Sequence, residues 1–212
     1  PEHPNFAYFQ ASGKPSHNGS CGSIYNHFDN SKYDEKLFSF PEVLMNLESK
    51  PSGTKPTGKS SPKKGKSTSG GEKALKTIKE IYKMATNTPP NDSYNGVKIK
   101  NILADVRSYS DYKDGIDGYH LVECNFYCFD KKEKTIIMNF PFLPNNKYYL
   151  RLCFKDEDLF KKEYSRFYDT GHTGIIVISG LWEKKDEEYR TKTIKAECTI
   201  KSEKQIAIIK KK

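Results

Sequence analysis

Aromatic and basic side chains recur along the C-terminal half of the chain in a pattern that suits the binding of an unpaired nucleic-acid strand. Bases stack on aromatic rings, while Arg and Lys contact the phosphates. The candidate residues are Arg107, Tyr109, Tyr112, Lys113, Tyr127, Phe129, Arg151, Trp182, Tyr189 and Arg190. Each ring taken alone could instead be a core or half-buried strand residue. As a set, they predict a surface for stacking and phosphate binding.

Acidic residues accompany this set and favour a different partner. They are Asp111, Asp114, Asp117, Glu183, Asp186, Glu187 and Glu188. Carboxylates repel phosphate groups. The acidic residues therefore favour either a protein partner or a nucleic-acid path that avoids these loops.

A second source of positive charge is the segment 50–71, which is a low-complexity tract of Pro, Gly, Ser and Lys. It contains six lysines and no acidic residue. Such a tract cannot bury enough apolar surface to offset its ordering entropy, so we expect a linker. Lys59, Lys63, Lys64 and Lys66 would form a basic arm that binds phosphates with little sequence preference. A plain solubilising linker is the alternative.

Three residues near the N-terminus are of types that bind zinc: His17, Cys21 and His27. Strong zinc motifs also show paired Cys-x2-Cys spacing, which this segment lacks. Polar residues of a docking loop are the better interpretation. We expect no metal and no other cofactor.

Catalytic motifs are absent from the sequence. It has no nucleophile elbow, no His-Glu-x-x-His and no Gly-rich dinucleotide turn. Lys98, Asp105 and Glu123 could imitate a metal-dependent nuclease site, although such residues are common on strands. We therefore expect a protein that is not an enzyme, with a nuclease as an alternative.

The composition favours a polyanionic partner. The chain has 212 residues and a net charge of +9, which suits nucleic acid. Its five cysteines are odd in number and show no close pairing, so we expect a reducing, intracellular compartment. The location would be nuclear or nucleoid-associated if the chain binds nucleic acid. No apolar run reaches the roughly 18 residues of a membrane span.

Strand-like segments follow Val97, and a single helical segment interrupts them. Strands are predicted at 97–107, 119–130, 135–140, 175–182 and 191–200, with 148–155 extending or following the third. The helix, at 158–168, lies between the third and fourth strands. This order predicts a mainly β fold with helices, built on a five-stranded OB-like barrel.

The strand at 119–130 has an alternating pattern, which predicts its two faces. The inward side chains would be Val122, Cys124, Phe126 and Cys128. The outward side chains would be Tyr119, Leu121, Glu123, Asn125, Tyr127 and Phe129.

Two helices are predicted before the barrel. Residues 1–49 look irregular apart from a short helix that Ser39 could cap, with Pro41 in its first turn. Residues 72–85 have the apolar spacing of an amphipathic helix, which could pack on the barrel or bind a protein partner. The expected organisation is thus 1–49, the linker 50–71, and an OB-like domain at 72–212. Residues 206–209 could add an edge strand.

Residues 96–202 resemble the OB-fold single-strand-binding superfamily in the order of their elements. The resemblance rests on Ile102–Val106, the long second strand, the helix 158–168 and the strand 175–182. It implies a ligand between the loops that join strands 1 to 2 and 4 to 5. Tyr109, Tyr112, Lys113, Trp182, Tyr189 and Arg190 would then contact the ligand.

The leading functional hypothesis is a non-catalytic protein that binds single-stranded DNA or RNA. A barrel face would supply stacking, and the lysine arm would add electrostatic affinity. A structural subunit that docks a protein partner within a nucleoprotein complex is a second hypothesis. A metal-dependent nuclease is the third.

Overall fold

The computed structural model describes residues 28–49, 73–142 and 146–209, and it is mixed α/β. Five long strands dominate it: β4 (Gly118–Asp130), β5 (Thr135–Phe140), β6 (Tyr148–Phe154), β7 (Ile175–Tyr189) and β8 (Lys192–Ile200). The shorter β3 (Leu103–Ala104) and β9 (Ile206–Ile209) complete a sheet of seven strands within the described residues. The expected edge strand at 206–209 is confirmed as β9, which pairs with β7.

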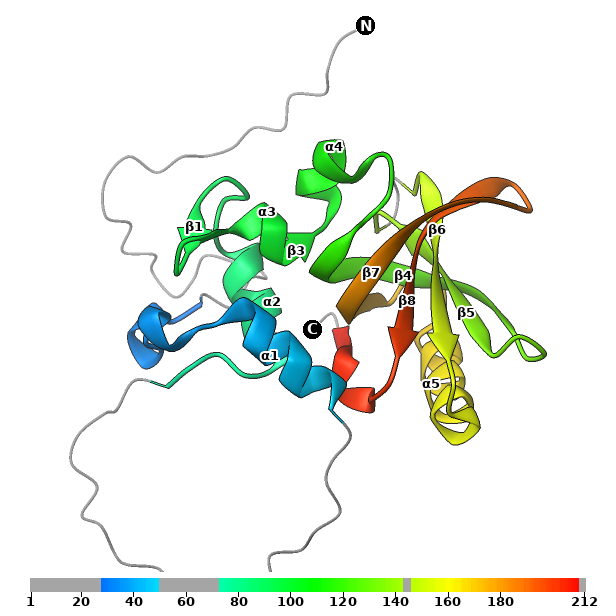
Figure 1. Ribbon diagram of the computed structural model, residues 1–212, viewed down its shortest axis with the longest axis horizontal. Coiled ribbons are helices and arrows are strands. Elements are labelled where there is room, and N and C mark those ends of the chain that lie inside the picture. The colour runs from blue at the N-terminus through cyan, green and yellow to red at the C-terminus, as the bar shows by residue number, and fades with distance from the viewer. Residues whose placement is uncertain (1–27, 50–72, 143–145, 210–212) are drawn as a thin grey trace, which may run out of the picture.

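The pairings of the five long strands close on themselves (Figure 1). β4 pairs with β5, β5 with β6, β6 with β8, β8 with β7, and β7 returns to β4. The β6–β8 pair is parallel, and the other four pairs are antiparallel. Helix α5 (Glu157–Thr170) connects β6 to β7, so the predicted helix between strands is present.

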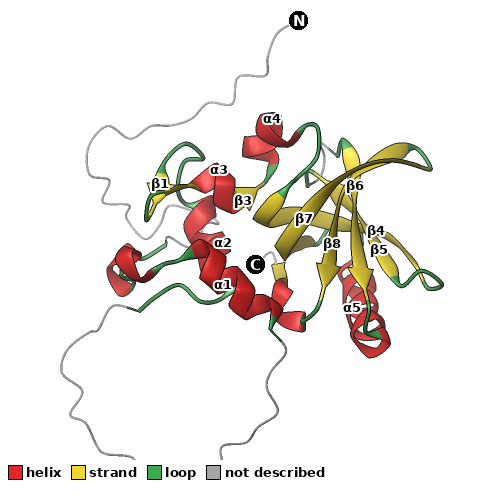
Figure 2. Cartoon of the chain, viewed as in Figure 1, coloured by secondary structure: helices red, strands yellow, loops and turns green. Residues whose placement is uncertain are grey.

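The remaining helices are short. They are η1 (Asn30–Lys32), η2 (Glu35–Leu37), α1 (Phe40–Glu48), α2 (Ile78–Thr86), α3 (Ile99–Ile102), η3 (Val106–Ser108), α4 (Tyr109–Tyr112) and η4 (Glu203–Gln205). A separate hairpin joins β1 (Ser93–Tyr94) to β2 (Val97–Lys98). Figure 2 shows α1, α2 and α3 on one side of the sheet and α5 at its far end. None of the helices in the described ranges is long and apolar enough to cross a membrane.

Two apolar cores hold these layers together. The main core lies among the five long strands and α5, and it includes Phe126, Leu150 and Trp182. The second core joins α1, α2 and α3 to the back of the sheet, where Leu121 and Val177 are fully buried. Residues 28–49 therefore pack directly against the elements that follow residue 73.

The two predicted leading helices form with altered boundaries. α1 follows Ser39 and has Pro41 in its first turn, but the Ser39 side chain makes no capping bond. α2 begins at Ile78 rather than at residue 72, because Thr77 is extended and forms a capping box with Glu80. The Glu80 carboxylate accepts the Thr77 backbone N–H at 3.1 Å.

The predicted strand at 97–107 is wrong. Ile99 and Ile102, three residues apart, are both fully buried, so the apolar residues occupy one face of a helical turn instead. The carboxylate of Asp105 then accepts the backbone N–H groups of Arg107 and Ser108 and starts η3. The segment 148–154 is a strand of its own, and β4 is thus the first strand of the closed cycle.

The predicted faces of β4 hold as far as Tyr127 and fail at Cys128 and Phe129. The register with β5 shifts between Phe126 and Cys128, which is a β-bulge that inserts one extra residue. Tyr127 and Cys128 therefore both pack outside, against Tyr149, while Phe129 packs against the main core. The expectations of an inward Cys128 and an outward Phe129 are wrong for this reason.

A close approach at Gly115 fixes the segment before β4 against β8. The φ of Gly115 is +107°, and an added Cβ would overlap the Lys195 carbonyl oxygen. We expect Gly115→Ala to lower the free energy of unfolding by about 3 kcal/mol, from backbone strain and overpacking. Denaturant unfolding would measure the loss.

Gly96→Ala is the matched control, because Gly96 also has a positive φ (+76°) but has open space around it. Its cost should stay near 1 kcal/mol. Equal losses in the two variants would contradict a packing role for Gly115.

Candidate nucleic-acid interface

Three tyrosines meet on the outer face of the sheet: Tyr127 of β4, Tyr149 of β6 and Tyr189 at the end of β7. The rings of Tyr127 and Tyr149 stack with centroids 4.6 Å apart and planes 22° apart. Tyr189 meets Tyr149 edge-on at 5.9 Å. Tyr149 is buried at 1% exposure, whereas Tyr127 and Tyr189 are half-buried. We call these residues, with Arg190 and Lys192, the tyrosine cluster.

Two cations accompany these rings. The Arg190 guanidinium lies 5.7 Å from the Tyr127 centroid and 5.4 Å from that of Tyr189, and Lys192 Nζ lies 5.2 Å from that of Tyr149. Within the described part of the chain, neither Arg190 nor Lys192 makes an ion pair. Their charge is therefore available to an anionic ligand.

Neighbouring groups hold the rings in place. Tyr149 Oη lies 3.1 Å from Thr191 Oγ1, and Tyr189 Oη lies 3.6 Å from Cys128 Sγ. Burial, with a contribution from Cys128, raises the pKa of Tyr189 to about 12. The hydroxyl of Tyr149 and the Arg190 guanidinium lower the pKa of Tyr127. The cluster is preorganised, so a ligand would not have to order it.

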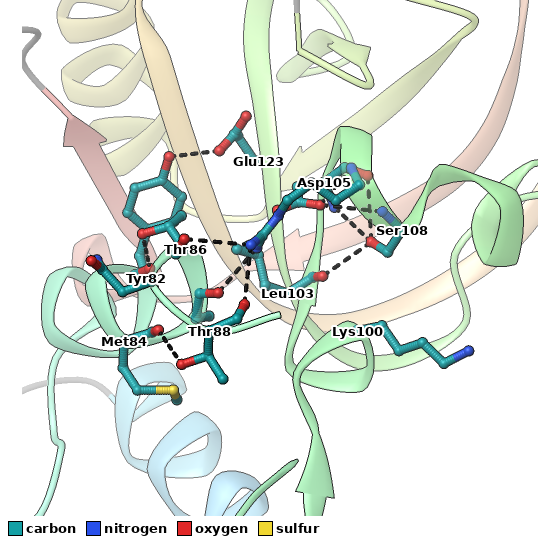
Figure 3. Close-up of polar contacts among 12 residues, drawn as sticks. Tyr82, Met84, Thr86, Thr88, Lys100, Leu103, Asp105, Ser108 and Glu123 are labelled. Carbon is teal, nitrogen blue, oxygen red and sulfur yellow. Dashed lines mark hydrogen bonds and ion pairs between the residues drawn. The ribbon is translucent and has the colours of Figure 1, made fainter. Parts of the chain in front are cut away.

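Arg107 is a structural residue rather than a ligand contact. Its guanidinium pairs with the buried Asp105 carboxylate at 2.7 Å. It also donates to the carbonyls of Ala85, Thr86 and Thr88, at the C-terminal end of α2, at 3.0, 3.4 and 3.1 Å. Figure 3 shows this polar cluster between α2 and the sheet.

Two of the predicted ring contacts are core residues. Trp182 is 1% exposed in the main core, and Tyr112 is buried and donates to the Lys100 carbonyl at 2.5 Å. These two rings cannot stack on a ligand without unfolding the region around them. Tyr109 is half-buried, and its ring packs against the rings of Phe140 and Tyr148.

The other predicted residues have separate places. Lys113 is exposed, and its carbonyl accepts from Lys195 Nζ. Arg151 forms ion pairs with Glu187 and with Glu197. Phe129 lies against Tyr164 of α5, with centroids 4.7 Å apart. Of the predicted positions, the structure thus brings Tyr127, Tyr189 and Arg190 together.

The acidic residues are partly neutralised. Asp111 pairs with Lys100 at 2.9 Å, Glu183 with Lys185 at 3.6 Å, and Glu187 with Arg151. Asp186 and Glu188 stay exposed on the β7–β8 hairpin. A phosphate path across the cluster must therefore avoid the outer side of this hairpin.

Of the three proposed nuclease residues, Asp105 and Glu123 have structural partners, and Lys98 is exposed at the end of β2. Asp105 pairs with Arg107, and Tyr82 of α2 donates to Glu123 at 2.6 Å (Figure 3). Burial raises the pKa of Glu123. Among the residues that the structure describes, no group of three or more His, Cys, Asp or Glu side chains is placed to hold a metal.

Several predicted residues lie outside the described ranges: His17, Cys21 and His27, and the arm lysines Lys59, Lys63, Lys64 and Lys66. The apolar face of α2, proposed above as a partner site, is buried in the second core through Ile78, Ile81 and Met84. That face is thus already occupied by this chain.

Two residues of the tyrosine cluster, Tyr149 and Lys192, are missing from the sequence-based prediction. Tyr149 lies two residues before the predicted Arg151, on the segment 148–155 that the sequence predicts to extend or follow the third strand. Its contact with Tyr127 depends on the pairing of β4, β5 and β6, which the sequence does not reveal. The available signal in the sequence is that Tyr149 is an aromatic residue on a predicted strand, because aromatic side chains of neighbouring strands interact favourably.

Comparisons with known proteins assign no family. No family model and no curated protein matches the chain. One solved structure, described as a putative aspartyl-tRNA synthetase from Leishmania major Friedlin, is similar to part of this chain. The match covers 59% of this chain and 23% of the chain of that structure. The sequence identity is 14% and the TM-score is 0.36. Neither a fold nor a function is inferred from a likeness of this degree.

The contacts of Arg107 predict a large effect on stability. We expect Arg107→Ala to lower the free energy of unfolding by about 2–4 kcal/mol, because Asp105 would stay buried without its counter-charge. Arg107→Lys should recover less than half, since an ammonium cannot reach the same set of acceptors. Urea titration with an unchanged m-value would measure both effects.

Lys32→Ala is the control for a surface ion pair, because Lys32 is 69% exposed in its pair with Asp29. Its loss should stay below about 1 kcal/mol. An equally small loss of unfolding free energy in Arg107→Ala would contradict the structural role of Arg107.

Glu123 predicts a pH dependence of stability. Its pKa is higher in the folded chain than the roughly 4.3 of an unfolded glutamate, so its contribution is greatest below that pH and is lost as the pH rises through the folded pKa. Glu123→Gln keeps an acceptor for Tyr82 but cannot ionise. The stability of the variant relative to the wild type should therefore increase as the pH rises above about 4.3, up to the raised pKa of the folded chain. If the unfolding free energies of Glu123→Gln and of the wild type change in parallel with pH, this prediction is refuted.

Proposed function

We propose that this chain is a non-catalytic protein that binds single-stranded DNA or RNA, with the tyrosine cluster as its contact surface. The closed pairing order β4-β5-β6-β8-β7 supports an OB-like barrel, as does α5 between the third and fourth long strands. Barrels of this kind bind oligonucleotides on the face of their second and third strands and on the loops that join strands 1 to 2 and 4 to 5. Here these are β5 and β6, the β4–β5 turn and the β7–β8 turn at Arg190.

The observation that carries the proposal is the pairing of two half-buried rings with two unpaired cations. Tyr127 and Tyr189 could each stack one base, at about 1–3 kcal/mol per base. Arg190 and Lys192 lie beside them and could contact the adjoining phosphates. Rings and unpaired cations side by side match a ligand that carries bases and phosphates in alternation.

The charge of the whole chain supports the same proposal. The net charge is +9, and the lysine tract 50–71 contributes six of the positive charges. A basic arm on the same chain as a stacking surface would raise affinity without adding sequence preference. A protein with this activity would work where single strands are exposed, in a nucleus or a nucleoid.

Binding of the full chain to single-stranded oligonucleotides tests the proposal. Tyr127→Ala should weaken binding about 5- to 150-fold, while Tyr127→Phe keeps the ring and stays near the wild type. Arg190→Asn should lower the slope of log affinity against log salt by about 0.7, because one phosphate contact is lost. Asn tolerates the positive φ of 53° at this position. Fluorescence anisotropy with DNA and RNA oligonucleotides would measure these changes.

Tyr168→Ala is the matched control, because Tyr168 is 68% exposed on α5, away from the cluster. It should leave affinity unchanged. Duplex DNA bound as tightly as single strands, or equal losses for Tyr127→Ala and Tyr168→Ala, would contradict the proposal.

A further inference from the structure

A depression of about 500 Å³ opens between the β4–β5 turn and the first turns of α5. Lys131 and Lys134 line it from the turn, and Phe160, Lys161 and Tyr164 line it from the helix. Figure 1 shows α5 beside this hairpin. The volume lies within the roughly 300–1,000 Å³ of ordinary ligand pockets, so the depression is large enough for a bulky side chain of a partner.

The depression and the tyrosine cluster lie on different sides of β4. The bulge between Phe126 and Cys128 leaves Tyr127 on the outer face, whereas Phe129 packs against the main core and against Tyr164 of α5. None of the five residues of the tyrosine cluster lines the depression. A ligand on the cluster would therefore leave the depression accessible to a second partner.

Hydrogen bonds hold the β4–β5 turn in a fixed shape. The Asp130 carboxylate accepts the backbone N–H groups of Lys132 and Glu133 at 2.9 and 3.1 Å. The Lys134 carbonyl accepts the N–H of Phe154 at 3.1 Å. The turn therefore presents its lysines to α5 from an ordered backbone.

An aromatic wall forms the helix side of the depression. The half-buried Tyr164 packs on Phe160 with ring centroids 5.7 Å apart, and Phe160 is itself buried in the main core. Phe129 contacts Tyr164 at 4.7 Å and fixes its ring further. An aromatic side chain of a partner would bury apolar area against this wall.

The charge of the depression is positive, because three lysines line it against one glutamate. The carboxylate of that glutamate, Glu157, lies 3.6 Å from Lys134 Nζ and 2.9 Å from Lys161 Nζ. Lys131 makes no ion pair within the described residues, and its ammonium lies 5.5 Å from the Tyr164 centroid. A partner's carboxylate could therefore pair with Lys131 without breaking an existing ion pair.

Glu157 favours a peptide over a nucleic-acid strand in this place. Its side chain is 55% exposed, and its hydrogen bond with Lys161 lowers the pKa of its carboxyl group, so it stays ionised at neutral pH. A peptide can place backbone N–H groups, which are donors, at this carboxylate and its own carboxylates at the lysines. Phosphodiester groups offer acceptors only and carry a charge on every unit, which Glu157 would repel.

We propose that the depression binds an acidic segment of a protein partner, with an aromatic side chain against Tyr164 and a carboxylate paired with Lys131. Backbone N–H groups of the segment would face Glu157. This inference goes beyond the proposed function and does not depend on it. The chain would then hold a protein at α5 while a single strand occupies the tyrosine cluster.

A fluorescein-labelled peptide of sequence Asp-Glu-Asp-Phe-Asp-Glu-Asp tests the inference with the full chain, by fluorescence anisotropy. One counterpart peptide has Asn and Gln in place of Asp and Glu, and the other has Ser in place of Phe. Each counterpart should bind at least about 5-fold more weakly than the parent peptide, because it lacks either the charge or the ring.

Variants of the turn and of the helix locate the bound peptide. Lys131→Glu should weaken the parent peptide about 10-fold, since an attractive pair becomes a repulsive one. Lys132→Glu is the matched control and should stay near the wild type, because Lys132 is exposed in the same turn but does not line the depression. Tyr164→Ala should remove the preference for Phe over Ser in the peptide, and Tyr164→Phe should keep it. Circular dichroism of each variant would confirm that the fold is intact.

An oligothymidylate of about 12 nucleotides separates the two classes of partner. It should bind the wild type and Tyr164→Ala equally well, and it should not displace the peptide. Displacement of the peptide by the oligonucleotide would assign the depression to nucleic acid and overturn this inference.

Three other results would overturn the inference and leave the proposed function intact. They are no detectable binding of the parent peptide, equal affinities for the parent and the neutral peptide, and equal losses for Lys131→Glu and Lys132→Glu. A chain that binds the peptide but no oligonucleotide would overturn the proposed function alone.

Discussion

The structure depends on a change of hydrogen-bonding partner within one strand. β4 pairs with β7 over Gly118–Cys124 and with β5 over Asn125–Asp130. A strand can do this only if it coils strongly, and a bulge increases that local twist. The bulge after Phe126 lies at this change. Because β4 serves both neighbours, the five long strands close and present few unpaired edges to other chains.

The same bulge determines which rings face outwards. Without the extra residue, the alternation of β4 would place Phe129 outside with Tyr127 and turn Cys128 inwards. With it, Tyr127 reaches Tyr149 and Arg190, while Phe129 reaches Tyr164 on α5. One backbone irregularity thus places Tyr127 in the tyrosine cluster and Phe129 against α5. Strand closure and the candidate ligand surface have a common cause.

Hydrophobic periodicity and composition predict the helices and strands that depend mainly on the local sequence. The strands near 119–130, 135–140, 175–182 and 191–200 and the helix near 158–168 form close to their expected positions. The failures share a cause, which is dependence on distant contacts. The segment 97–107 folds into short pieces around Asp105, whose partner Arg107 also binds α2. A sequence pattern does not reveal these long-range contacts of Arg107, and it does not reveal the strand register that brings Tyr149 against Tyr127.

The second core has a functional consequence because of the face that it covers. α1, α2 and α3 bury Leu121 and Val177 on the back of β4 and β7. Arg107 and the Tyr82–Glu123 hydrogen bond attach α2 at that position. Among residues 28–49, 73–142 and 146–209, the side chains that pack on Tyr149 at the outer face of the sheet include Tyr127, Tyr189 and Lys192. The helices α1, α2 and α3 thus cover the side of the sheet opposite to the tyrosine cluster.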